Sequence, residues 1–297
     1  MVAISSDTLP ARLVHFGPYA SLVEFDDCDD LLEGFKSILR GWHVREVSEQ
    51  GTPPPIIRFS KRDGRFQWQS ERLPPPDDWS PRGPRKVMDG VADFHYRFLD
   101  WHALEFTNQF CLHCAAVRVG GGLVIFPSGK KAGKSTLVTE LALRGYQIFC
   151  DDVLPIELGG NDGLAMGILP RLRLPLPENI SPDHSRFVDR RMGLADRYAA
   201  YINFRPSELA AFGTTAPIRA IVLLRRSDAP VSARLLPAGR AETLARMIDQ
   251  NFATHLSPTL IFDEMSALMD RAELRTLEFS DVGQAAQCIA ETYGGGA

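Results

Sequence analysis

A glycine-lysine loop between an apolar strand and an amphipathic helix constrains this chain more than any other feature. The loop spans Ser128 to Thr136, follows the apolar run LVIFP at 123–127 and precedes a helical pattern at 134–144. Such a turn aims backbone N–H groups and the positive end of a helix dipole at one point, which suits a phosphate group. We assign nucleotide binding to Ser128, Gly129, Lys130, Lys131, Ala132, Gly133, Lys134, Ser135 and Thr136.

The loop follows the pattern GxxxxGK[ST], except that Ser128 stands at the first glycine. We expect Gly129 to supply the backbone freedom of the replaced glycine. Lys134 should reach the β- and γ-phosphates of ATP, and the Ser135 hydroxyl should bind Mg²⁺. The alternative is a chance glycine-lysine turn before a helix, which the flanking strand and a nearby acidic pair argue against.

Asp151 and Asp152 form that acidic pair, directly after a predicted strand at 146–150. The carboxyl ends of neighbouring parallel strands meet at one sheet edge, so these acids should lie beside the loop. Phosphoryl transfer to a hydroxyl uses a metal ligand and a base, and two carboxylates can divide these roles. The structural alternative is a helix cap or a turn.

His113 opens the apolar segment HCAAVRV at 113–119, which the glycines at 120–122 should turn back onto the strand at 123–127. In that register His113 lies opposite Ser128, where it would orient or tune an aspartate. A purely structural histidine is an equal alternative. Cys111 and Cys114 form a CxxC without a second pair of metal ligands, so zinc is not expected.

Arg171 and Arg173 lie two residues apart within GILPRLRLPLP at 167–177 and would share one face of a strand. Guanidinium groups offer paired donors to phosphate oxygens, so both arginines are candidates for nucleotide binding. Solvated charges on a proline-rich loop explain them equally well.

The proline-rich segment 73–85 predicts a boundary between two domains. Residues 1–85 hold two hairpins and a helix, which predicts a small α+β domain. The expected elements are hairpins at 10–25 and 56–70, the latter turning at Asp63-Gly64, and a helix at 29–41. Residues 86–297 show the strand-loop-helix-strand order of α/β nucleotide-binding proteins. The other elements expected there are helices at 89–109, 241–252, 262–272 and 281–292 and strands at 219–226 and 274–279.

Composition narrows the class of protein. The net charge of -4 argues against a broad basic surface for nucleic acid. Five unevenly spaced cysteines do not suggest a disulfide framework, and no apolar run reaches the length of about 20 residues that spans a bilayer. We therefore expect a cytoplasmic protein with no membrane segment and no signal peptide.

The ordered set His113-Cys-Ala-Ala-Val, the loop from Ser128, Leu-Arg-Gly145-Tyr and Asp151-Asp152 resembles the HPr serine kinase/phosphorylase superfamily over about residues 111–290. It is more similar to the HPr-kinase-related kinases, including those that modify ribosomal peptides such as lasso peptides, than to HPr kinase itself. The loop residues Ser128, Lys130 and Lys131 are atypical of the family. The family's second glycine-rich signature, with its glutamate, is not recognisable around 165–175.

The resemblance implies a P-loop kinase domain of HPr-kinase type, preceded by a small α+β domain that docks the acceptor. It implies that Asp151 is the base, that His113 assists it, and that Asp152 and Ser135 are the magnesium-side groups. It also raises homo-oligomerisation as an expectation, although no motif in this chain specifies an interface.

These observations predict an ATP- and Mg²⁺-dependent kinase that phosphorylates a serine-type hydroxyl of a protein or peptide. The alternatives are a small-molecule kinase, an NTPase that couples hydrolysis to motion, and a nucleotide sensor without catalytic activity. The chain has no NKxD or LSGGQ motif, which disfavours a G protein and a transporter ATPase.

Overall fold

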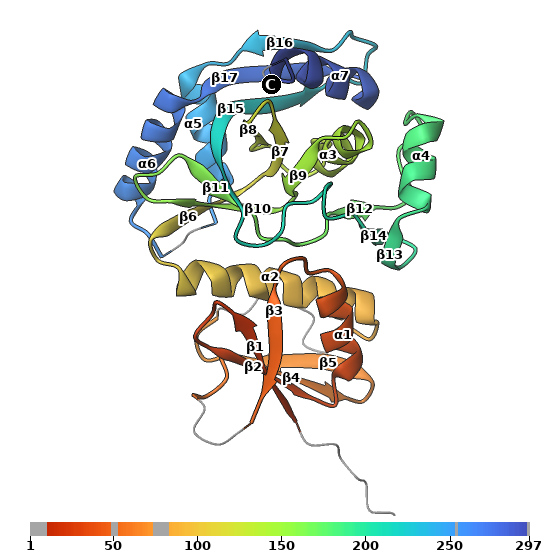
Figure 1. Cartoon of the computed structure of the whole chain (residues 1–297), viewed down its shortest axis with the longest axis vertical. Coiled ribbons are helices and arrows are strands. Elements are labelled where there is room, and N and C mark those ends of the chain that lie inside the picture. Colours follow the sequence, from red (N-terminus) through yellow and green to blue (C-terminus); the bar gives the residue numbers. More distant parts are fainter. Residues whose placement is uncertain (1–10, 49–52, 74–82, 253–254, 296–297) are drawn as a thin grey trace, which may run out of the picture. The chain divides into compact units, whose positions relative to one another are not determined.

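The computed structural model describes residues 11–48, 53–73, 83–252 and 255–295 (Figure 1). The chain divides into two compact units, Met1–Glu105 and Phe106–Ala297. Both units combine helices and strands, as predicted. Among the described residues no helix combines the length and the apolar character needed to cross a membrane.

In its described residues, the first unit contains a five-stranded sheet in the order β3-β1-β2-β4-β5 and two helices. Its elements are β1 (Arg12–Gly17), β2 (Leu22–Asp26), α1 (Asp29–Ser37), β3 (His43–Val47), β4 (Ile57–Arg62), β5 (Arg65–Gln69) and α2 (Val87–Glu105). Both predicted hairpins are confirmed, because β1 pairs antiparallel with β2 and β4 with β5. The β4–β5 turn uses Asp63 and Gly64 at φ 51° and 67°, the left-handed conformation that a tight hairpin turn requires.

An aromatic core joins both helices of the first unit to its sheet. The Phe94 ring of α2 lies 4.0 Å from that of Phe35 in α1 and 4.7 Å from that of Phe59 in β4, between ring centroids. Phe94, Phe98 and Trp101 of α2 have no exposed surface. Helix α2 therefore belongs to the first unit because its apolar face is part of that core.

This packing corrects the predicted boundary at residue 85, which lies instead between Glu105 and Phe106. Most of the predicted linker, residues 74–82, lies outside the described residues. Its end is attached to β5: the Phe66 N–H donates to the Pro84 carbonyl at 2.8 Å. Gly83 has φ +64°, and a Cβ there would lie 2.0 Å from the Phe66 carbonyl oxygen, so only glycine fits.

The second unit contains a nine-stranded mixed sheet and a separate three-stranded sheet, β12-β14-β13. The strands of the large sheet are β6 (Gln109–His113), β7 (Ala115–Val119), β8 (Gly122–Phe126), β9 (Gln147–Cys150), β10 (Val153–Glu157), β11 (Asp162–Leu164), β15 (Thr215–Arg226), β16 (Arg234–Pro237) and β17 (Glu273–Phe279). The small sheet consists of β12 (Arg171–Arg173), β13 (Met192–Ala195) and β14 (Ala199–Ile202). The helices are α3 (Lys134–Leu143), α4 (Pro182–Asp189), α5 (Arg240–Asp249), α6 (Pro258–Arg271) and α7 (Val282–Tyr293).

The large sheet runs in the order β6-β10-β11-β15-β8-β7-β9, and β17 pairs with β15. Strands β8, β15 and β17 are parallel neighbours, whereas β7 pairs antiparallel with both β8 and β9. We predicted β8 and β9 as direct parallel neighbours, and this is wrong because β7 lies between them. They still run in the same direction, so their carboxyl ends reach the same edge.

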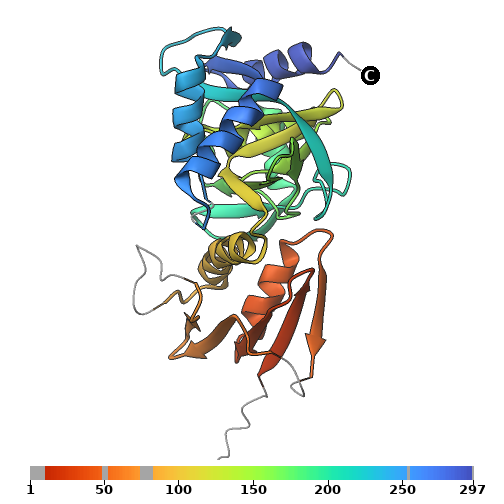
Figure 2. The ribbon, with the colours of Figure 1, turned by 90° about the vertical axis from the view of Figure 1, so that its left-hand side faces the viewer.

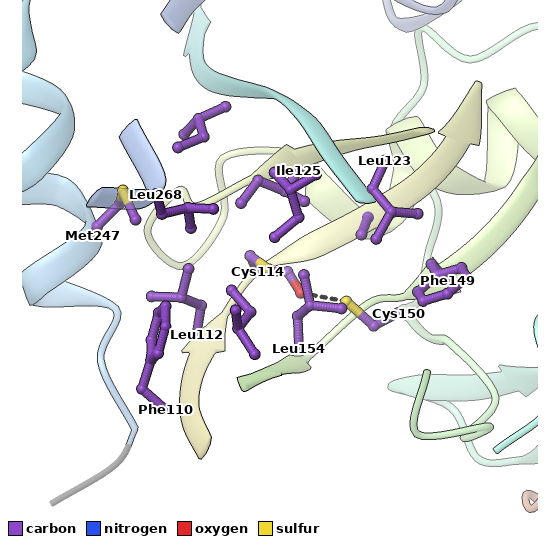
Figure 3. Close-up of a cluster of buried hydrophobic side chains, with 14 of the residues drawn as sticks. Phe110, Leu112, Cys114, Leu123, Ile125, Phe149, Cys150, Leu154, Met247 and Leu268 are labelled. Atoms are coloured by element: carbon purple, nitrogen blue, oxygen red, sulfur yellow. Dashed lines mark hydrogen bonds between the residues drawn. The ribbon is translucent and has the colours of Figure 1, made fainter. Parts of the chain in front are cut away.

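Helices cover the large sheet on both faces (Figure 1), with α5 and α6 on one side and α3 and α7 on the other. Figure 2 shows α5 and α6 in front of the strands. Met247 of α5 and Leu268 of α6 are buried against Leu112 and Ile125 of the sheet (Figure 3). Cys114 and Cys150 belong to the same core, and the Cys150 thiol donates to the Cys114 carbonyl at 3.3 Å. This core holds the strand ends that carry the loop and the acids.

Candidate functional site

The glycine-lysine loop connects the end of β8 to the first turn of α3, as predicted. Gly133 caps the helix at φ +94°, and Lys131 also has a positive φ, +68°. Gly129 does not adopt the left-handed conformation. The expectation that Gly129 supplies the special backbone freedom is therefore wrong, because the turn is made at Lys131 and Gly133. Lys131 pays about 1–3 kcal/mol for this conformation, which a non-glycine residue adopts only when its surroundings enforce it.

Ser128, at the position of the usual first glycine, has a structural contact of its own. Its side chain is buried, and its hydroxyl accepts a 3.0 Å hydrogen bond from the Leu224 N–H of β15. The hydroxyl thus ties the start of the loop to the neighbouring parallel strand. This contact explains why a serine can replace glycine at a site where the loop must be held in place.

The Lys134 ammonium lies inside the loop. It donates to the Ser128 carbonyl at 2.5 Å and to the Gly129 carbonyl at 3.4 Å. Burial lowers the pKa of Lys134, and the Asp151 carboxylate opposes this effect. The charge is therefore desolvated at the mouth of the loop, where an anionic ligand would compensate it.

Strand β7 brings the loop and the acids to one edge of the sheet. Its first residues pair with the last residues of both neighbours, Ala115 with Phe126 of β8 and Ala116 with Cys150 of β9. The loop begins just beyond Phe126, and Asp151 directly follows Cys150. The predicted meeting of loop and acids is thus present, although through an intervening antiparallel strand.

Asp151 is buried beside the loop. Burial, followed by the charge of Asp152, raises its pKa well above the usual range. The Ser135 hydroxyl, the Lys134 ammonium and the Arg171 backbone N–H lie close enough to oppose this rise. Among the described residues, neither Asp151 carboxylate oxygen accepts a hydrogen bond of ordinary geometry. A buried carboxylate with incomplete hydrogen bonding next to a hydroxyl suits a divalent cation or its bound water.

Asp152 is more exposed and faces His113. The His113 Nε2 lies 3.9 Å from the Asp152 Oδ1, and about a third of each side chain is exposed, 30% and 33%. Burial and the Lys134 ammonium lower the pKa of His113, while Asp152 raises it. In the structure His113 therefore lies beside Asp152, and Ser135 lies beside Asp151. The sequence expectation was the reverse, with His113 assisting Asp151 and Ser135 sharing the magnesium side with Asp152.

His113 reaches this position by a route that differs from the predicted one. It is the last residue of β6 and pairs with Val153 of β10, so it does not lie opposite Ser128. Cys114 separates β6, which pairs with β10, from β7, which pairs with β8 and β9. The predicted pairing of Val119 with Gly122 is confirmed.

Arg171 and Arg173 lie two apart on β12 with the buried Leu172 between them, so they share a face as predicted. The Pro170 carbonyl accepts from the Ile202 N–H of β14, and the Leu174 N–H donates to the carbonyl of Tyr198, just before β14. The backbone of Arg171 and Arg173 therefore points to the other edge of β12, and the Arg171 N–H approaches Asp151 there. Phosphate binding by the two guanidinium groups stays a prediction.

Three residues beside the loop were missed by the sequence analysis. Arg246 of α5 lies next to Gly129, with its Nη1 3.8 Å from the position that a Cβ would take there. Arg226 of β15 and Phe279 of β17 line a cleft that also includes Gly133 and Thr136. No local motif marks these residues, because each reaches the loop from an element distant in sequence.

A larger open cavity of about 540 Å³ lies on the other side of the loop that follows β12. Its walls include Leu174, Leu176, Asp189 and Arg197. The cavity and the cleft beside Gly133 share Pro177 and Ile180, so one loop separates them.

Comparison with protein-family models and with curated proteins finds no match to this chain. Among solved structures, the HPr(Ser) kinase/phosphatase from Coxiella burnetii is similar at 12% sequence identity, with 61% of this chain and 95% of that chain covered and a TM-score of 0.29. A similarity of this size does not establish a common fold or activity. The chemistry of the site therefore rests on its own geometry.

Proposed function

We propose that this chain is an ATP-dependent kinase that transfers a γ-phosphoryl group to a serine-type hydroxyl of a protein or peptide. The observation that carries the proposal is the convergence of a strand-loop-helix phosphate loop with two aspartates of different environment. Lys134, Ser135 and Asp151 lie together, and Asp152 lies beside them with His113. Phosphoryl transfer requires phosphate binding, a metal site and a base, and these groups can supply all three.

On the donor side, the loop N–H groups and Lys134 would bind the β- and γ-phosphate oxygens. Ser135 and Asp151 are the residues suited to hold Mg²⁺, since the cation takes few protein ligands and completes its shell with water and phosphate oxygens. Bound there, Mg²⁺ would neutralise charge on the phosphates.

On the acceptor side, Asp152 is the group that a substrate hydroxyl can reach, because its carboxylate is partly exposed. It would accept the hydroxyl proton, and His113 would orient it and share that proton. We infer from these contacts that the base and metal roles of the two aspartates are exchanged relative to the sequence expectation.

The direct test is incubation of the full chain with Mg²⁺ and γ-labelled ATP, with and without a mixture of cellular peptides. Label on a peptide serine supports the proposal. Release of phosphate that peptides do not affect would instead indicate an NTPase. Nucleotide binding without either reaction would indicate a sensor.

The variant Lys134→Ala tests the role of the phosphate loop. The variant should bind Mg-ATP about 10–100-fold more weakly, as expected for the loss of a charged hydrogen bond, and should lose transfer. Its far-UV circular dichroism should match that of the parent chain. Fluorescence titration with a labelled ATP analogue measures the affinity. Unchanged affinity and turnover would remove the loop from the mechanism.

A further inference from the structure

Helix α5 holds one arginine over the phosphate loop. The Nη1 of Arg246 lies 3.8 Å from the Cβ position of Gly129. The Gly129 carbonyl also accepts a 3.4 Å hydrogen bond from the Lys134 ammonium. Two cationic side chains, from helices α5 and α3, therefore approach the same loop residue from different elements.

The end of α5 is attached to the strand that carries His113. The His113 N–H donates to the Gln250 carbonyl at 2.8 Å, and the Phe252 N–H donates to the Cys111 carbonyl at 2.8 Å. Earlier in the helix, Met247 is fully buried in the core of the second unit. Arg246 is thus carried by a helix that is fixed at both its buried face and its C-terminal end.

The guanidinium group itself remains available to a ligand. Its ion pair with Asp249 is loose, at 3.6 Å, and 46% of the Arg246 side chain is exposed. An exposed pair of this kind contributes little, so an anion can displace Asp249 at low cost. A guanidinium group also provides two parallel donors that match phosphate oxygens.

We propose that Arg246 binds the γ-phosphoryl group of the nucleotide and stabilises the negative charge that develops on it during transfer. This inference rests on the proposed kinase function and adds to it a residue supplied by the same chain. The position beside Gly129 favours the γ-phosphate, because Lys134, the residue expected at the β- and γ-phosphates, reaches the same carbonyl.

The test compares the affinity of the full chain for AMP-PNP and for ADP, both with Mg²⁺. The variants are Arg246→Ala, Arg246→Lys and, as control, Arg240→Ala on the same helix. Arg240 donates to Asp270 of α6 at 2.6 Å and is not part of the site. Arg246→Ala should weaken AMP-PNP binding about 10–100-fold and leave ADP binding unchanged, because only AMP-PNP has a γ-group.

Turnover gives a second readout. Arg246→Ala should lower the rate of phosphate transfer or of ATP hydrolysis about 10³-fold, as for other arginines that stabilise phosphoryl transfer. Added guanidinium at a non-denaturing concentration should restore part of that rate. Arg246→Lys should fall between the parent and Arg246→Ala, since lysine keeps the charge and loses the paired donors. Arg240→Ala should behave like the parent chain.

Two outcomes would contradict the role of Arg246 and leave the proposed kinase function intact. One is an active parent chain whose preference for AMP-PNP survives in both Arg246 variants. The other is an equal loss of AMP-PNP and ADP affinity, which indicates general electrostatic attraction. A parent chain that binds no nucleotide and shows neither transfer nor hydrolysis would instead refute the kinase function itself. If Arg246→Ala unfolds, Arg246→Lys and its AMP-PNP/ADP ratio decide the question.

Discussion

At the residue scale, Asp151 and Asp152 are adjacent in the chain but differ in burial and in neighbours. Asp151 is 5% exposed and lies near Ser135 and Lys134. Asp152 lies at 3.9 Å from His113 and keeps a third of its surface. The backbone alternates sides after β9, so one carboxylate enters the core beside the loop and the other faces outward. This difference is the reason for giving the two acids separate tasks.

Substituting each aspartate in turn shows which of them is the base and which is the Mg²⁺ ligand. Asp152→Asn should retain nucleotide affinity and lower the transfer rate about 10²–10⁴-fold, the usual contribution of a general base. Asp151→Asn should instead raise the Mg²⁺ concentration needed for half-maximal rate about 10-fold or more. Steady-state rates measured across a Mg²⁺ titration check both. The reverse result would restore the roles expected from sequence, and identical behaviour would mean that the pair acts as one site.

At the scale of elements, a buried contact between a histidine and a carboxylate attaches helix α4 to the phosphate-loop helix α3. His184 Nδ1 of α4 lies 2.8 Å from Glu140 Oε2 of α3, and the two side chains are 0% and 5% exposed. Burial alone would raise the pKa of Glu140, but the contacts with His184 and Arg144 prevail and lower it. The pair therefore depends on both partners being present.

Removing the histidine should be costly because the buried Glu140 carboxylate loses its contact with His184 and keeps that with Arg144. His184→Ala should lower the free energy of unfolding by about 1–3 kcal/mol. Arg186→Ala, on the same helix but 62% exposed, should change it by less than about 0.5 kcal/mol. Urea unfolding followed by far-UV circular dichroism measures both. Equal stability of the two variants would show that the His184–Glu140 contact does not attach α4 to α3.

Helix α2 contains a carboxylate whose charge opposes folding. Burial raises the pKa of Asp93, and Arg97 and the Trp68 side chain only partly offset the effect. A raised carboxyl pKa means that the folded state binds the proton more tightly than the unfolded chain does. The resulting instability is absent below the unfolded pKa, about 3.9 for aspartate, and is complete above the raised folded pKa.

Asp93→Asn should therefore gain stability relative to the parent as the pH rises from about 4 to 7, since the amide cannot ionise. Tryptophan fluorescence during urea unfolding isolates this effect, because all four tryptophans (42, 68, 79 and 101) lie in the first unit. Trp68→Phe, which keeps an aromatic ring, although a smaller one, and removes the N–H donor, controls for loss of the Asp93 contact. A stability difference that does not vary with pH would contradict the assignment.

At the scale of the whole molecule, the division into units changes where the chain can be cut. A chain that begins at Phe106 retains every element of the second unit. A chain that begins at Lys86 carries α2 without its sheet and exposes Phe94, Phe98 and Trp101, which are fully buried in the intact protein. Exposed aromatic surface of this kind promotes aggregation.

The two truncated chains should therefore differ. The chain that begins at Phe106 should be monodisperse in gel filtration and bind Mg-ATP, and the one that begins at Lys86 should aggregate. If the first unit docks the acceptor, the Phe106 chain should also hydrolyse ATP at the parent rate and phosphorylate peptides poorly. Full peptide turnover would contradict docking by the first unit and leave the kinase assignment intact. A soluble chain from Lys86 would contradict the boundary after Glu105.

The sequence by itself determined the local structures. Asp63-Gly64 specified its hairpin because the turn needs positive φ at both residues, and these residue types adopt it. The phosphate loop, its helix and the acids after β9 were readable for the same reason, since turn chemistry and apolar periodicity act over a few residues.

Only the tertiary structure decided how those pieces meet. Strand β7 lies between β8 and β9, His113 lies on β6 beside Asp152, and Arg246 lies over Gly129. Helix α2, whose apolar pattern the sequence showed clearly, belongs to the first unit because the partners of Phe94 come from there. Local propensity does not encode these placements. They follow from which distant strands and helices bury their apolar faces together, and one sequence pattern is compatible with several such partners.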